Sequence, residues 1–151
     1  MLQFNECVRV FDNQACFLLF HLAIVPVILV LVNADATFAS FVRRVLQPER
    51  AERFIALSAS TKGRKKILDD LCHKFEPAIR PTAIRPPAYA SIWDKPCLVF
   101  YESVGFGINF KTVRKAYDAL SLGDGWLILL SDGSAGIHRP EARWDDEKLL
   151  A

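Results

Sequence analysis

One uncharged apolar run near the start of the chain limits how the protein can fold. Ala15 to Val32 reads ACFLLFHLAIVPVILVLV, eighteen residues without a formal charge. This length is at the lower edge of what spans a bilayer, so either lipid or the rest of the protein must cover the run. Ala34-Asp35-Ala36 then offers a small-x-small site of the kind that signal peptidases cut. The first twelve residues carry a net negative charge, however, whereas a signal peptide begins with positive charge.

A buried strand is the alternative interpretation of the same run. Val25 to Val32 is rich in β-branched residues, and Asn33-Ala34-Asp35 is turn-like, which is typical of a strand buried on both faces. A wrongly chosen start codon is a third explanation. We therefore divide the chain into an apolar N-terminal segment, residues 1–36, and a single globular domain, residues 37–151. We expect a cytoplasmic protein, with membrane association through residues 15–32 as the alternative.

Helices are expected at the start of the globular domain. Apolar residues recur at helical spacing from Thr37 to Leu46, and a second helix begins at Glu49. Ser60 or Thr61 caps a third helix that runs from Lys62 to about Glu76. The next twenty residues, 77–96, contain five prolines and can be neither a regular helix nor a central strand.

Strands dominate the last third of the chain. We expect a strand at Cys97–Tyr101, a helix from Phe110 to about Leu120 capped by Asn109, and a strand at Trp126–Leu130. Asp132-Gly133 predicts a tight hairpin, after which residues 135–138 pair back. The predicted fold class is α/β or α+β, with N-terminal helices followed by a β-α-β-β unit that ends in a hairpin.

Positive charge is concentrated in the helical part. The whole chain has a net charge of only +2, but residues 40–85 hold eleven Lys and Arg against five Asp and Glu. Four cations lie in the first turn of the third helix, where they oppose the helix dipole. Such an arrangement can mark a contact face, and it can equally be a solvated helical surface. The predicted contact set is Arg43, Arg44, Arg53, Lys62, Arg64, Lys65 and Lys66, with Arg50 beside them.

The partner of such a face would be anionic. Phosphate contacts need only positive charge within reach, and apart from Gln47 this block offers no Asn, Gln or exposed aromatic side chain to read bases. Nucleic-acid binding would therefore be nonspecific. If residues 15–32 enter a membrane, the same cations would lie near anionic lipid headgroups instead. A protein partner is the remaining option.

Catalytic and metal motifs are weak. Gly105-Phe-Gly107 resembles a phosphate-binding loop, but Phe110 replaces the third glycine, so we expect a flexible loop. Cys72 and His73 could form a hydrolase site only if the fold brings His138 and Glu102 to them. The four cysteines and three histidines show no spacing typical of a metal site. We predict no catalytic residues, no metal and no cofactor.

The stretch TKGRKKILDDLCH, with CLVFYES and GWLILLSDGSAGIHRPE further on, is similar to a loose group of small bacterial proteins of unassigned activity. The similarity covers about residues 40–142 and implies an order of elements but no chemistry. Our leading hypothesis is a non-enzymatic interaction or regulatory domain with a basic contact face. The alternatives are a small hydrolase that uses Cys72, His73 and His138, and a membrane-tethered accessory protein.

Overall fold

The computed structural model describes residues 34–120, 123, 125–141 and 147–151. The apolar run at residues 15–32 lies outside the described residues, so its predictions stay predictions. The described residues belong to one compact unit, Asn33–Ala151. Within the described part, no helix is both long and apolar enough to cross a membrane.

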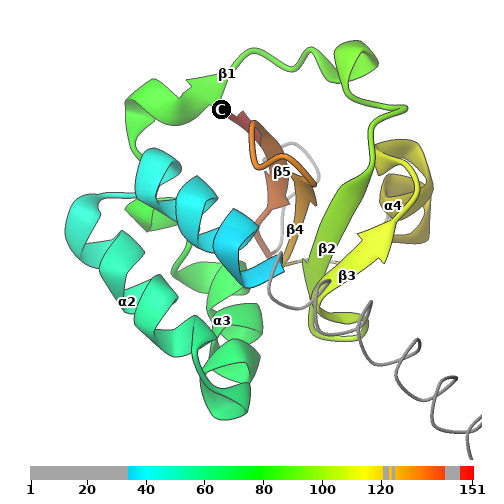
Figure 1. Ribbon diagram of the computed structural model, residues 1–151. Helices are drawn as coiled ribbons and strands as arrows, with labels where there is room; N and C mark the ends of the chain where they lie inside the picture. Colours follow the sequence, from blue (N-terminus) through cyan, green and yellow to red (C-terminus); the bar gives the residue numbers. More distant parts are fainter. Residues whose placement is uncertain (1–33, 121–122, 124, 142–146) are drawn as a thin grey trace, which may run out of the picture. The chain divides into compact units, whose positions relative to one another are not determined.

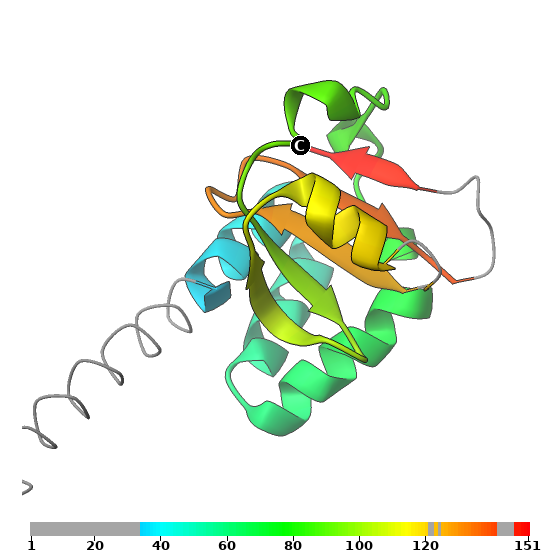
Figure 2. The ribbon, with the colours of Figure 1, turned by 90° about the vertical axis from the view of Figure 1, so that its right-hand side faces the viewer.

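Three helices cover one face of a six-stranded antiparallel sheet, and α4 covers the other (Figures 1 and 2). The architecture is α+β with the helices N-terminal to the sheet, in agreement with the predicted class. The helices span residues 34–45, α2 (Pro48–Ser58), α3 (Thr61–His73) and α4 (Val113–Leu120). The strands are β1 (Ile84–Arg85), β2 (Cys97–Tyr101), β3 (Gly105–Phe110), β4 (Trp126–Leu130), β5 (Gly136–Arg139) and β6 (Lys148–Leu150), in the spatial order β1-β6-β5-β4-β2-β3.

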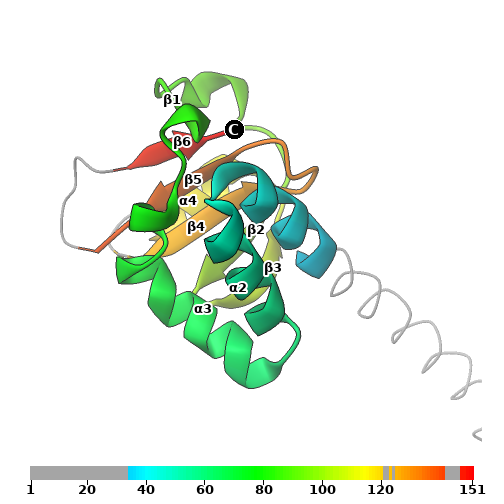
Figure 3. The same cartoon turned by 90° about the vertical axis from the view of Figure 1, so that its left-hand side faces the viewer.

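Alternating strand residues separate the core into two halves. Leu127 and Leu129 of β4 face the three N-terminal helices, whereas Ile128 and Leu130 face α4. Because both faces of this central strand are covered, all five of its residues are buried. Figure 3 shows the helical layer from its outer side, with α2 and α3 side by side over the sheet.

Local signals explain the helix boundaries. Ser60, one of the two predicted caps, is the N-cap of α3, where its side chain accepts a hydrogen bond of 3.0 Å from the Gly63 N–H. Pro48 lies in the first turn of α2, where a backbone N–H would have no hydrogen-bond acceptor within the helix. α3 ends at His73 rather than near Glu76, and a separate 3-10 turn, η1 (Glu76–Ala78), begins three residues later with Pro77 inside it.

The proline-rich segment behaves as predicted, with neither a regular α-helix nor a central strand. It contains η1, η2 (Pro81–Ala83), η3 (Tyr89–Ser91) and the two-residue strand β1. β1 lies at one edge of the sheet and pairs only with β6 among the described strands. Proline is tolerated at such an edge because one side of the strand needs no ladder partner.

Two predictions about the last third of the chain are wrong. Residues Gly105–Phe110 form strand β3 rather than a loop followed by a helix, and α4 begins only at Val113. The β2–β3 register shifts after Val99, which leaves Gly107 as the extra residue of a β-bulge with φ of 70°. Asn109 therefore lies within a strand and caps no helix. A further strand, β6, was not predicted.

Candidate functional site

Most of the predicted basic residues bind the protein's own oxygens. Arg64 Nη2 lies 2.6 Å from Asp35 Oδ2, and Arg64 Nε donates a hydrogen bond of 2.9 Å to the Ser58 carbonyl. Its guanidinium also lies 5.4 Å from the centre of the Phe106 ring. Arg64 therefore joins the start of α3 to the end of α2, to β3 and to the helix at 34–45.

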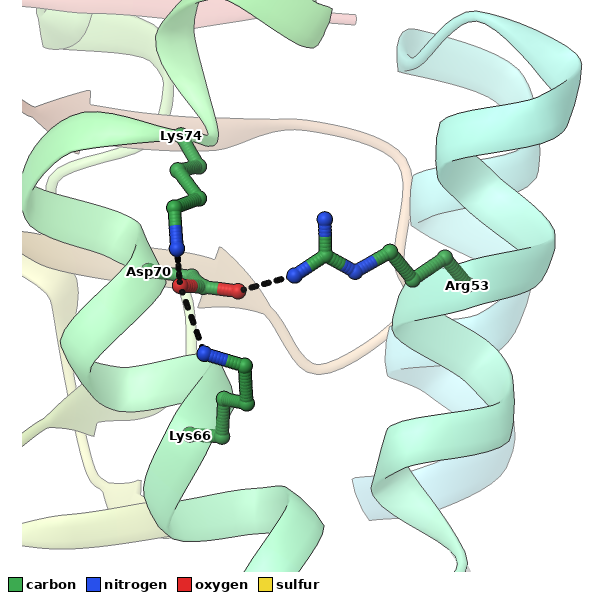
Figure 4. Close-up of polar contacts among 4 residues, drawn as sticks. All are labelled: Arg53, Lys66, Asp70 and Lys74. Atoms are coloured by element: carbon green, nitrogen blue, oxygen red, sulfur yellow. Dashed lines mark hydrogen bonds and ion pairs between the residues drawn. The ribbon is translucent and has the colours of Figure 1, made fainter.

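Asp70 gathers three further cations. Its side chain is only 1% exposed, and it lies 3.1 Å from Arg53, 2.9 Å from Lys74 and 3.5 Å from Lys66, measured between the nearest nitrogen and oxygen atoms (Figure 4). Arg53 is on α2 and the other residues are on or next to α3, so the carboxylate holds the two helices together. A buried carboxylate requires such partners, because an isolated charge would be strongly disfavoured.

The two arginines of the first helix also have internal partners. Arg43 Nε lies 3.2 Å from Glu52 Oε1 in an exposed ion pair. Arg44 donates to the Gly133 carbonyl in the β4–β5 hairpin, and its guanidinium lies 5.8 Å from the Phe41 ring centre. These contacts connect neighbouring elements. Most residues of the predicted contact set are therefore bonded to other groups of the protein.

Lys62 and Lys65 are different, since both are exposed and neither has a hydrogen bond or ion pair within the described residues. Together with Lys66 they line a groove with a volume of about 470 Å³. We call this the basic groove. Its lining residues are Leu57, Ser60, Lys62, Gly63, Lys65, Lys66, Asp69 and Glu102.

The basic groove is formed by the α2–α3 junction, one face of α3 and the β2–β3 turn. Lys62, Lys65, Lys66 and Asp69 are spaced i, i+3, i+4 and i+7, which places them on the same side of α3. The positive end of the α3 dipole adds to the field of the three ammonium groups. Asp69 and Glu102 supply the opposite charge, so the groove offers both signs. Its lysine-rich end suits an anionic group.

Sequence reasoning overlooked the acidic side of this groove. The spacing of Asp69 relative to the lysines was a usable signal once the helix was predicted. Glu102 comes from the other end of the fold, and it was considered only as a catalytic group. Its position in the groove depends on tertiary packing that no local pattern contains.

The residues of the hydrolase alternative do not share a cleft. His138 is fully buried; its Nε2–H donates a hydrogen bond of 3.0 Å to the Leu71 carbonyl, and its ring lies 4.9 Å from that of Phe75. Burial lowers the pKa of His138 to about 4. His73 lies in solvent, where its Nε2 is 2.9 Å from Glu141 Oε2. The geometry does not support a catalytic pair.

The remaining candidates also have structural explanations. The Gly105 and Gly107 backbone belongs to a strand and forms no phosphate-binding loop before a helix. Glu147, near the C-terminal end of the described chain, accepts hydrogen bonds from Tyr117 and pairs with the buried Arg139. No group of three metal-ligating side chains occurs among the residues described. His21 lies outside them.

Comparison with known proteins adds no family: no family model, curated protein or solved structure is significantly similar to this chain.

Proposed function

We propose that the protein is a non-enzymatic interaction domain whose basic groove binds an anionic group of a partner. The observation that supports this proposal is the contrast among the cations of α3. Arg64 and Lys66 have carboxylate partners in the protein, whereas Lys62 and Lys65 are exposed in the groove without one among the described residues. Cations that oppose a helix dipole and form no internal pair are available for a ligand.

The chemistry of the groove limits what it can recognise. An ammonium group acts as a compact positive charge with three donors, so Lys62 and Lys65 fit a phosphate or carboxylate without fixing its orientation. Leu57 provides an apolar wall next to the lysines. We therefore expect selectivity for negative charge with an adjacent apolar part, rather than for one defined small molecule.

Titration of the ¹⁵N-labelled full chain with tripolyphosphate and with hexaglutamate tests the proposal. The amide signals of the groove residues, Ser60 to Lys66 and Glu102, should shift with at least one of these probes. The K62Q/K65Q variant should bind that probe roughly tenfold more weakly, because each exposed ion pair contributes up to about 1 kcal/mol.

The K111Q/K115Q variant is the matched control. Lys111 and Lys115 are two exposed lysines at the start of α4, on the opposite face of the sheet from the groove. This variant has the same change in net charge and should bind like the wild type. Equal weakening in both variants would mean that only the net charge matters, and it would refute a site in the groove.

A further inference from the structure

The described chain begins beside the basic groove. Asp35 is paired with Arg64, which lies between Lys62 and Lys65 in the sequence of α3. Ala34 is buried against β3, where a Cβ atom on Gly107 would lie 2.7 Å from the Ala34 Cβ. Residues 34 and 35 are therefore fixed next to the first turns of α3, the part of the helix that supplies the groove lysines.

The uncharged apolar run ends immediately before this fixed point. Val32 is separated from Ala34 by Asn33 alone, and one residue of extended chain covers at most about 3.6 Å. The run has eighteen residues, enough to cross the hydrocarbon layer of a bilayer or to enter it. Lipid insertion of this run would hold the first turns of α3 at the level of the headgroups.

The groove has the chemistry of a headgroup contact. Lys62 and Lys65 provide unpaired ammonium groups within the described part, and lysines near an anionic leaflet are attracted to it. Val104 lies in the same β2–β3 turn as Glu102. Its apolar side chain is 37% exposed and could contact the membrane interface. Asp69 and Glu102 oppose the lysines, so the attraction is that of a small net positive charge.

We infer that the anionic partner of the basic groove is a phospholipid headgroup, and that residues 15–32 insert into the same bilayer. This inference rests on the proposed function and names its partner. Two observations from different parts of the chain support it: a lipid-compatible run in the sequence and unpaired lysines next to the point where that run joins the fold.

Amine footprinting of the full-length wild-type chain tests the inference. The protein is mixed with vesicles of phosphatidylcholine, with or without phosphatidylglycerol, and acylated with an amine-reactive reagent. Mass spectrometry then reports labelling at each lysine. Phosphatidylglycerol should reduce labelling of Lys62 and Lys65 and leave Lys111 and Lys115 unchanged. About 1 M salt should abolish the protection, since the Debye length then falls to about 3 Å.

Two results overturn the inference. The first is a chain that stays with the soluble fraction, since residues 15–32 then do not enter the bilayer. The second is a vesicle-bound chain whose Lys62 and Lys65 react equally with both kinds of vesicle. If hexaglutamate or tripolyphosphate still shifts the groove signals in either case, the proposed function stands and only the lipid partner is wrong. If neither probe shifts them, both proposals fail.

Discussion

His138 is enclosed between α3 and the sheet, and this position makes the stability of the protein sensitive to acid. Burial lowers the pKa of the imidazole from its ordinary value of 6.5 to about 4. Between these values the unfolded chain binds a proton that the folded chain excludes. The contribution of neutral His138 to stability is therefore complete above pH 6.5 and is lost as the pH falls toward 4.

The size of the effect follows from the two pKa values. Each unit of difference between folded and unfolded pKa corresponds to about 1.36 kcal/mol, so the free energy of unfolding should fall by about 3 kcal/mol over this range. This is a large part of the 5–15 kcal/mol typical of a domain. Urea unfolding, followed by circular dichroism between about pH 7 and pH 4, measures it.

Two variants isolate the contribution of His138. The amide of His138→Gln can still donate a hydrogen bond toward the Leu71 carbonyl but does not titrate, so the variant should lose about 3 kcal/mol less than the wild type on acidification. His73→Gln makes the same replacement at the exposed histidine and is the control for the substitution itself. Parallel pH profiles of wild type and His138→Gln would refute the reasoning, as would an NMR titration of His138 near pH 6.5.

Gly63→Ala should destabilise the protein by about 2 kcal/mol in urea unfolding despite the better helix propensity of alanine, because the new Cβ would lie 1.9 Å from a backbone carbonyl oxygen of α2; a more stable variant would contradict this. Asp70→Asn should lower the free energy of unfolding by about 2 kcal/mol in the same assay. This is less than is usual for breaking a buried ion pair, because the three cationic partners of Asp70 are partly exposed and can be hydrated once the carboxylate is removed. Glu147→Gln should cost about 3 kcal/mol, since Arg139 is only 4% exposed and loses its carboxylate, and an unchanged urea midpoint would argue against that pair. Burial raises the pKa of the Cys97 thiol to about 12, so iodoacetamide at about pH 8 should label Cys97 only after urea is added, and labelling of the native protein would contradict its burial.

The features predicted correctly are those encoded within a few neighbouring residues. Ser60 caps α3 through an N–H three residues away, so its role can be read from a short segment. Asp132-Gly133 turns the β4–β5 hairpin in the same way: Gly133 adopts φ of 71°, and the Asp132 side chain accepts a hydrogen bond of 2.8 Å from the Ser134 N–H.

Strand β3 could not be predicted because its glycines favour a loop when they are considered alone. In the fold, Gly107 is a bulge residue whose positive φ and lack of a side chain allow close approach to Ala34. The hydrogen bonds that make this segment a strand come from β2. A pattern confined to residues 105–110 therefore does not distinguish a glycine-rich loop from a bulged edge strand.

The sequence locates the basic residues, but it does not separate those that bind groups of the protein from those that are exposed. Arg64 binds Asp35, which is 29 residues away, and Arg53 binds Asp70 on another helix. Only the packing of the helices separates these structural arginines from the exposed Lys62 and Lys65. Charge density along the sequence thus located the cations, but it did not show that several of them are bound to carboxylates of the protein itself.

The place of β6 in the sheet sets an order of events during biosynthesis. β6 is the last strand of the described chain, yet it lies between β5 and β1, with Leu149 and Leu150 opposite Arg85 and Ile84. During synthesis, β1 therefore leaves the ribosome well before β6, the strand with which it pairs. β1 has only two residues and is followed by Pro86 and Pro87, which lack a backbone N–H. Before β6 is made, β1 therefore offers few hydrogen-bonding groups to strands of other chains. The α2–α3 pair and strands β2, β3 and β4 can therefore assemble first. The sheet is complete only after β6, the last strand of this unit, has been synthesised.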